Sequence, residues 1–171
     1  MSGPPVHPRG ADIIAAVKEA DVEYIVALPD IVTSDGLLWP IARDPDLKLV
    51  RICKEDEGVS ICAGLSYCDR RALLLIQQTG LLDSLNAVRA IALDYGLPIC
   101  MMVGLQGKEP HLKPRQSAAL GVRIIEPVLE AMELPYHLIE EPDDCRLIRP
   151  GIEDAYRRSR PLCFLVGRSP S

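Results

Sequence analysis

The chain of 171 residues has few aromatic side chains, 4% of the total, and no long hydrophobic run. Its core must therefore be built from Ala, Leu, Ile and Val, which dominate the 48% of hydrophobic residues. No apolar stretch reaches the roughly 18–20 residues that span a bilayer. Because residues 1–8 also lack the apolar segment of a signal peptide, we expect a cytoplasmic protein in which residues 1–9 form a flexible arm.

Sequence patterns for several common activities are absent as well. No Gly-x-Gly-x-x-Gly follows the first apolar run, and no Gly-x-x-x-x-Gly-Lys-Ser/Thr is present, which argues against dinucleotide and P-loop nucleotide sites. There is no Gly-x-Ser-x-Gly and there are only three histidines, which disfavours a hydrolase. The net charge of -5 argues against a nucleic-acid-binding surface.

The six cysteines form no Cys-x-x-Cys pair and have no histidine at the spacing of a metal site. Three of them, Cys53, Cys100 and Cys163, lie in or beside apolar, strand-like runs. We therefore expect reduced core thiols rather than disulfides or metal ligands.

Strand-like and helical patterns alternate along the whole chain. Strands are predicted at 22–28, 47–52, 72–77, 97–103, 136–139 and 162–166. Helices are predicted at 10–20, 34–42, 55–67, 81–95, 124–132 and 143–158, the last one broken or restarted at Pro150. The run 72–77 is apolar on both faces, as a central parallel strand should be. The pattern predicts a three-layer αβα sandwich around a six-stranded, mainly parallel sheet, in a single domain from 10 to 168.

Three acids, Glu55, Asp56 and Glu57, follow the second predicted strand and open a helix of small apolar residues. Ligands in open α/β sheets bind at the carboxyl ends of the strands. A carboxyl half-buried at such a junction is expected to have a raised pKa, which suits proton transfer. The alternative is that the acids only stabilise the positive end of the helix, and the local pattern alone does not exclude it.

A second polar run follows the third predicted strand and precedes the longest predicted helix. Within it, Gly80 allows close approach of the backbone, and free N–H groups at the helix start can hold an anion. The alternative is a helix cap made by Thr79. Because the two strands are expected to run parallel, Glu55 and Gly80 should lie at the same edge of the sheet.

Two of these runs together resemble a known family. Glu55, followed nine positions later by the glycine of Cys62-Ala63-Gly64, resembles the pyrimidine-binding (PYR) domain of thiamine diphosphate enzymes. The runs 78–86 and 102–108 resemble the corresponding segments of the sulfopyruvate and phosphonopyruvate decarboxylases. The resemblance covers about residues 10–168. Within the family, the sequence most resembles the alpha subunit of sulfopyruvate decarboxylase, which is a free-standing PYR domain of about this length.

The resemblance implies a thiamine diphosphate-binding fold in which Glu55 is the catalytic residue. The carboxyl of this glutamate would bond the aminopyrimidine ring of the cofactor and favour its reactive tautomer. The resemblance also places Thr79, Gly80 and Leu81 at the cofactor. Asp30, at the end of the first predicted strand, is a further candidate contact, with a cap on the following turn as the alternative.

The resemblance further implies that half of the active site is missing from this chain. The family holds the diphosphate and its Mg²⁺ with a Gly-Asp-Gly run and a later Asn on another domain, and this sequence has no such pair. We therefore expect no metal ligands here and a diphosphate-binding (PP-domain, beta) partner subunit. The isolated chain can also form a homo-oligomer, with the helices 55–67 and 81–95 as its expected contact surfaces.

The implied reaction is decarboxylation of a 2-oxo acid that carries a second anionic group, such as 3-sulfopyruvate, to give sulfoacetaldehyde and CO₂. Lys108, His111 and Arg115 are candidates for binding that second anion, with a solvated charged loop as the alternative. Other functions that the sequence leaves open are decarboxylation of phosphonopyruvate or another 2-oxo acid, carboligation, and a non-catalytic PYR-like binding or assembly module.

Overall fold

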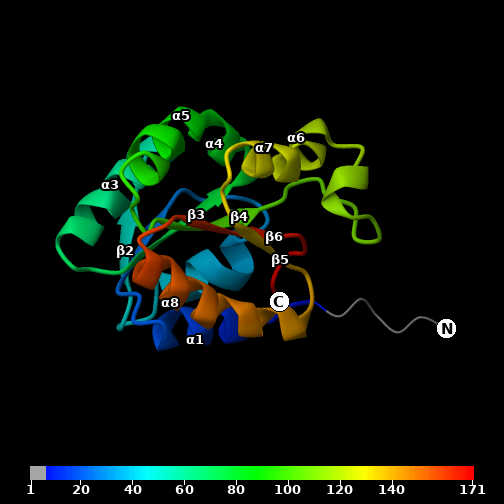
Figure 1. Ribbon diagram of the computed structural model, residues 1–171. Coiled ribbons are helices and arrows are strands. Elements are labelled where there is room, and N and C mark those ends of the chain that lie inside the picture. The colour runs from blue at the N-terminus through cyan, green and yellow to red at the C-terminus, as the bar shows by residue number, and fades with distance from the viewer. Residues whose placement is uncertain (1–6) are drawn as a thin grey trace.

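The computed structural model describes residues 7–171 and contains one six-stranded sheet with helices on both faces (Figure 1). All strands are parallel, in the order β2-β1-β3-β4-β6-β5. Their bounds are β1 (Tyr24–Ala27), β2 (Lys48–Arg51), β3 (Ala72–Gln77), β4 (Cys100–Gly104), β5 (Tyr136–Ile139) and β6 (Leu162–Val166). The predicted αβα sandwich is confirmed, and the sheet is parallel throughout.

The helices form two layers, one on each side of the sheet (Figure 1). One layer contains α3 (Glu55–Tyr67), α4 (Gln78–Asp83), α5 (Leu85–Ala87), the wide turn η2 (Val88–Leu93), α6 (Leu120–Arg123) and α7 (Ile125–Ala131). The other contains α1 (Gly10–Glu19), η1 (Ser34–Leu38), α2 (Trp39–Ile41) and α8 (Ile148–Arg158). Two short turns, η3 (Pro114–Gln116) and η4 (Pro142–Leu147), complete the regular structure.

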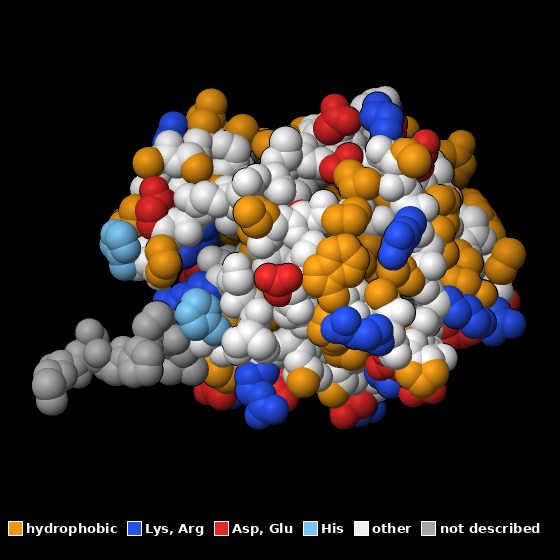
Figure 2. Space-filling model, turned by 180° about the vertical axis from the view of Figure 1, so that it is seen from behind, with side chains coloured by type: hydrophobic (Ala, Val, Ile, Leu, Met, Phe, Trp, Pro, Cys, Tyr) orange, Lys and Arg blue, Asp and Glu red, His pale blue; other side chains and the backbone are white. Residues whose placement is uncertain are grey.

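Side-chain alternation along the central strand β3 builds both hydrophobic cores. Leu73 and Leu75 belong to the core beneath α1 and α8, whereas Leu74 and Ile76 belong to the core beneath α3 and α7. Because successive side chains of a strand point to opposite faces, a strand covered on both sides must be apolar at every position. On the outer surface, acidic and basic side chains are interspersed with apolar ones over the face seen in Figure 2.

The longest predicted helix differs from the prediction in one respect that concerns the site. It begins at Gln78 rather than at Leu81, and it divides at Ser84 into α4, α5 and η2. The hydroxyl of Ser84 donates to the carbonyl oxygen of Gly80 at 2.7 Å, a back-bond that bends helices. Gly80 therefore lies inside a helical turn and not in the loop before it.

The helix predicted at 143–158 is restarted near its proline. The turn η4 ends at Leu147, and α8 begins at Ile148 with Pro150 in its first turn, where a missing N–H is tolerated. The helix predicted at 124–132 corresponds to α7, and the short helix α6 precedes it at residues for which no helix was predicted. The strand predicted at 97–103 begins three residues later, at Cys100.

The beginning of the described chain lies beside its end. The carbonyl oxygen of Pro8 accepts from the N–H of Ser171 at 3.1 Å, and the N–H of Gly10 donates to the carbonyl oxygen of Ser171 at 3.0 Å. Residues 1–6 of the predicted arm lie outside the described residues. Within residues 7–171, every helix is too short or too polar to cross a membrane.

Candidate functional site

The carboxyl ends of β2, β1, β3 and β4 are neighbours at one edge of the sheet, so the loops that follow these strands meet there. In the register, Ala27 lies between Arg51 and Leu75, and Gln77 pairs with Gly104. The polar ends of the second and third strands therefore share an edge, as the sequence predicts. The single strand β1 separates them, so a side chain must reach across its end for the two runs to touch.

A glycine in α3 brings the start of that helix close to the sheet. A Cβ atom at Gly58 would lie 2.4 Å from Cδ1 of Leu74 and 2.9 Å from Cδ1 of Ile52, so any side chain here would push the helix away. This close packing places Glu55, the first residue of α3, level with the ends of the strands.

The side chain of Glu55 lies directly against Gly80. A Cβ atom at Gly80 would stand 2.1 Å from Oε1, 2.2 Å from Cγ and 2.3 Å from Cδ of Glu55, so the carboxyl group occupies the space of the missing side chain. Glu55 is half-buried, and within residues 7–171 its carboxyl has no hydrogen-bond or ion-pair partner. The structure thus joins two predicted site residues and leaves the carboxyl able to bond a ligand.

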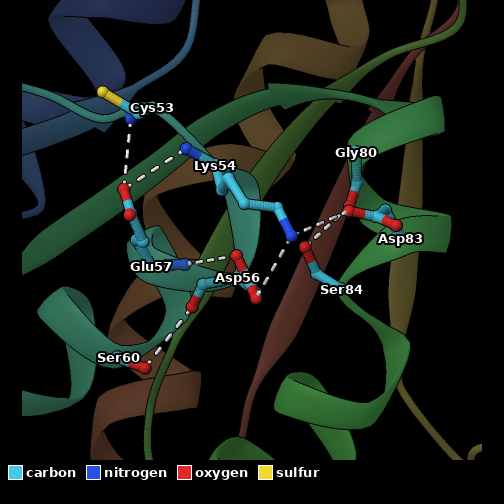
Figure 3. A network of polar contacts seen from close by, with 8 residues as sticks. All are labelled: Cys53, Lys54, Asp56, Glu57, Ser60, Gly80, Asp83 and Ser84. Atoms are coloured by element: carbon cyan, nitrogen blue, oxygen red, sulfur yellow. Dashed lines mark hydrogen bonds and ion pairs between the residues drawn. The ribbon is translucent and has the colours of Figure 1, made fainter.

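The other two acids of the run are engaged at the helix start (Figure 3). Oε2 of Glu57 accepts from the backbone N–H groups of Cys53 at 3.1 Å and Lys54 at 3.3 Å, which is a helix-capping contact. Oδ1 of Asp56 accepts from the N–H of Glu57 at 3.0 Å. Hydrogen bonds at the helix start are therefore made by Glu57 and Asp56 and not by Glu55, although all three acids lie in the first turn of α3.

Lys54 connects the start of α3 loosely to α4. Its Nζ lies 3.9 Å from a carboxylate oxygen of Asp56 and 3.9 Å from one of Asp83 (Figure 3). All three side chains are largely exposed, and such surface pairs contribute only about 0–1 kcal/mol. The contact between Glu55 and Gly80 therefore depends on backbone packing more than on this cation.

Thr79 and Leu81, the neighbours of Gly80, differ in what they can offer a ligand. Thr79 is exposed, and its Oγ1 accepts from Nε2 of Gln77 at 2.6 Å rather than from a helix N–H. The side chain of Leu81 is fully buried in the core, so only its backbone can face a ligand.

Asp30 is buried, and its carboxylate is used within its own turn. Oδ1 accepts from the N–H of Val32 at 2.6 Å and from the N–H of Thr33 at 3.0 Å, while Oδ2 accepts from the Thr33 hydroxyl. A Cβ atom at Gly104 would lie 2.9 Å from Oδ1 of Asp30, so this turn packs on the end of β4. Asp30 thus caps the turn that follows β1, which is the alternative to a direct contact with the cofactor.

Two of the three candidate cations are paired with acids. The side chain of Lys108 has 0% exposure, and its Nζ forms an ion pair with Glu140 and donates to the carbonyl oxygen of Glu109 at 3.1 Å. This ammonium group is therefore neither solvated nor open to a substrate.

Arg115 lies beside two acids of α7. Its guanidinium is 3.4 Å from Glu126 and forms an ion pair with Glu130, and these contacts raise the pKa of Arg115. Burial raises the pKa of the Glu126 carboxyl, although the nearby Arg115 opposes that shift. His111 and Arg115 are both exposed, but among residues 7–171 no hydrogen bond or ion pair engages the side chain of His111.

The cysteines are all free, and four of the six are buried. Burial raises the pKa of the Cys62 thiol to about 12. Cys53 was predicted to be a core thiol but is exposed, because β2 ends at Arg51 and Cys53 lies in the connection to α3. Within residues 7–171, no group of three or more His, Cys, Asp or Glu side chains is arranged to hold a metal ion.

No family model matches the chain, but individual proteins do. The sulfopyruvate decarboxylase subunit alpha of Methanococcus maripaludis is 26% identical over 90% of this chain and 91% of its own length. The subunit of the same name from Methanocaldococcus jannaschii is 25% identical over 90% of this chain and 89% of its own length. The chain is a homologue of sulfopyruvate decarboxylase alpha subunits.

A further relative is longer than the chain. The sulfopyruvate decarboxylase of Methanosarcina acetivorans is 29% identical over 90% of this chain but over only 38% of its own length. The same sequence unit thus occurs both as a named alpha subunit and as part of a longer protein.

Several structural features at this edge were not predicted from the sequence. Gly58 sets the depth of α3, Gln78 is buried at the start of α4, and Lys108 is paired inside the protein with Glu140. The glycine has a sequence signal, because it stands inside a helical pattern where glycine is unfavourable. The other two depend on partners about 30 residues away, for which the local pattern contains no signal.

Proposed function

We propose that the chain is the PYR-domain alpha subunit of a two-chain, thiamine diphosphate-dependent decarboxylase of 2-oxo acids, with 3-sulfopyruvate as its substrate. The observation that carries the proposal is the half-buried carboxyl of Glu55, which rests on Gly80 at the carboxyl edge of the sheet. The names of the relatives support the reaction and the substrate.

The residues at this edge fit the aminopyrimidine end of thiamine diphosphate. A carboxyl group that has no partner among residues 7–171 and lies beside a glycine backbone suits a flat, nitrogen-rich ring. Thr79 and the backbone at Leu81 would flank the ring, and Asp30 would contribute through the turn that it holds. When bound, thiamine diphosphate supplies the centre that accepts the electron pair as CO₂ leaves.

Glu55 would hold and exchange a proton at the ring nitrogen, and this is the step that the chain itself performs. A carboxyl can donate a proton and take it back, whereas a carboxamide of the same shape cannot. The close packing at Gly58 and the bare backbone at Gly80 fix the position of the carboxyl relative to the strands. Positioned acid–base groups typically contribute about 10²–10⁴-fold to a rate.

A partner subunit is part of the proposal. The 38% coverage of a longer decarboxylase supports a function that needs further sequence besides this chain, and the name 'subunit alpha' of the relatives of similar length supports its location on a second polypeptide. The partner would be the diphosphate-binding PP-domain (beta) subunit, which would also hold the Mg²⁺. The free thiols fit a cytoplasmic location for the pair.

The test is reconstitution with the partner subunit. The chain, a cognate PP-domain subunit, thiamine diphosphate and Mg²⁺ are mixed with 3-sulfopyruvate, and release of CO₂ is measured. We expect Glu55→Gln to lower kcat by about 10²–10⁴-fold. The matched control is Glu57→Gln, two residues along the same helix, where the carboxylate only caps the backbone.

Two results would refute the proposal: no turnover of any 2-oxo acid, or a fully active Glu55→Gln enzyme. Rates with a panel of 2-oxo acids that includes phosphonopyruvate and pyruvate show which of them is the substrate. Analysis of the products shows whether the aldehyde is released or is joined to a second molecule by carboligation. Stable assembly with the partner but no turnover would indicate the non-catalytic assembly module instead.

A further inference from the structure

The first residue of α4, Gln78, has a buried side chain, 5% exposed, that bonds the loop after β4. Its Nε2 donates to the carbonyl oxygen of Gln106 at 3.0 Å, and its Oε1 accepts from the N–H of Gln106 at 2.8 Å. The last register pair between β3 and β4 is Gln77 with Gly104. The main chain turns into α4 after Gln77, so β3 has no further peptide group to pair with β4. The carboxamide of Gln78 takes the place of that peptide group by bonding both the N–H and the carbonyl oxygen of Gln106.

A carboxamide makes both of these bonds, and neither a carboxylate nor an apolar side chain can replace it. A carboxylate accepts but does not donate, so glutamate would place its charge against the carbonyl oxygen of Gln106. A leucine would leave both backbone groups of Gln106 without their partner, and an unpaired, partly buried polar group is unfavourable. The chemistry of Gln78 is therefore specific, although its sequence position looks like an ordinary helix start.

Gly80 lies between two such side-chain bonds. On one side Gln78 ties the start of the turn to the loop after β4, and on the other Ser84 donates to the carbonyl oxygen of Gly80 at 2.7 Å. The backbone of Gly80 is the surface on which the carboxyl of Glu55 rests. Displacement of this turn would move that surface and the carboxyl with it.

We propose that Gln78 is a positioning residue, which acts through Gly80 to hold the Glu55 carboxyl in its reactive place. The inference rests on the proposed function of Glu55. It adds that a buried amide that takes no part in the proton transfer affects the rate, because it fixes the turn against which the acid is held.

The test compares Gln78→Leu and Gln78→Glu with the control Gln116→Leu. Gln116 is exposed, and its side chain accepts only from the N–H of Lys113 within the same turn. In the reconstituted holoenzyme we expect both Gln78 variants to lower kcat by about 10–10²-fold while KM for the 2-oxo acid changes little, because small misplacements of a reacting group have large effects on rate. Gln116→Leu should match the wild type.

Combination with Glu55→Gln separates positioning from a general structural defect. If Gln78 acts through Glu55, the double variant should be no slower than Glu55→Gln alone, because coupled residues are not additive. Independent, multiplying losses would overturn the proposal, as would full kcat in Gln78→Leu. If Gln78→Leu fails to fold, the same single and double variants are measured with Gln78→Glu, which keeps the size of the side chain and its acceptor atom.

Amide hydrogen exchange on the free chain tests the contact without any turnover. The amide of Gln106 and those of the turn from Gly80 to Ser84 should exchange faster in Gln78→Leu than in the wild type, and unchanged exchange would overturn the proposal. An inactive wild-type holoenzyme would refute the proposed function, whereas an active wild type with an equally active Gln78→Leu would refute only the role of Gln78.

Discussion

Replacement of Gly80 by alanine tests the contact on which the proposed site depends. The new Cβ atom would lie 2.1 Å from Oε1 of Glu55, whereas ordinary van der Waals contact begins near 3.4 Å. The carboxyl must therefore move by at least about 1 Å, since close-packed atoms do not overlap. The glutamate should yield rather than the helix, because its side chain is half-buried and flexible.

The expected effect is on activity and not on folding. A misplacement of about 1 Å can lower a rate by about 10²-fold, so we expect kcat of Gly80→Ala to fall by that order. Alanine is favoured over glycine inside a helix by about 1 kcal/mol, so the free energy of unfolding should not decrease.

The assay pairs Gly80→Ala with Gly121→Ala. A Cβ atom at Gly121 would meet only Cδ1 of Leu82, at 3.9 Å, so this control adds the same methyl group to a helix without displacing a neighbour. Decarboxylation by the reconstituted enzyme gives kcat, and urea unfolding of the free chain gives the stability. If Gly80→Ala folds, assembles and turns over as fast as Gly121→Ala, the reasoning about the Glu55 carboxyl is wrong.

Three further predictions concern the free chain. Gly64→Ala should raise the free energy of unfolding by about 0.5–1 kcal/mol in urea titrations, because no atom within 4 Å opposes a Cβ atom at this helical position; a decrease would contradict it. Lys108→Met should lower that free energy by about 3–5 kcal/mol, since it leaves the Glu140 carboxylate without its buried cation, and Glu140→Leu added to it should restore most of the loss. A thiol reagent should label two of the six cysteines rapidly in the folded protein, the exposed Cys53 and Cys68, and the remaining four only after unfolding; rapid labelling of more than two would show that the core opens readily.

The placement of Glu55 and Gly80 at the same edge of the sheet was predictable because it follows from strand direction. In a parallel sheet all carboxyl ends lie at one edge, so two polar runs that each follow a strand lie at that edge, and the observed strand order leaves only β1 between them. The contact itself was not predictable, because it depends on how deeply α3 packs, and that depth is set by the fit of Gly58 against Leu74.

The roles of the cations were beyond the local pattern for a related reason. Lys108 stands in a polar run that is typical of a solvated loop, yet its ammonium group is buried because Glu140, after β5, lies within reach. Arg115 was an equal candidate for a substrate anion, and it is held by acids of α7. Charge patterns along a sequence do not indicate which acid a cation will meet.

The layers of the fold were predictable from the sequence, because hydrophobic periodicity is local and each run of residues shows which of its own faces is buried. A strand that is apolar at successive positions, as 72–76 is, requires cover on both sides. Which of the three adjacent acids lacks a partner became clear only in the folded chain, since the contact of Glu55 with Gly80 depends on the distance between two separate segments. Such distances are set by the packing of the whole chain, and local sequence patterns therefore do not predict them.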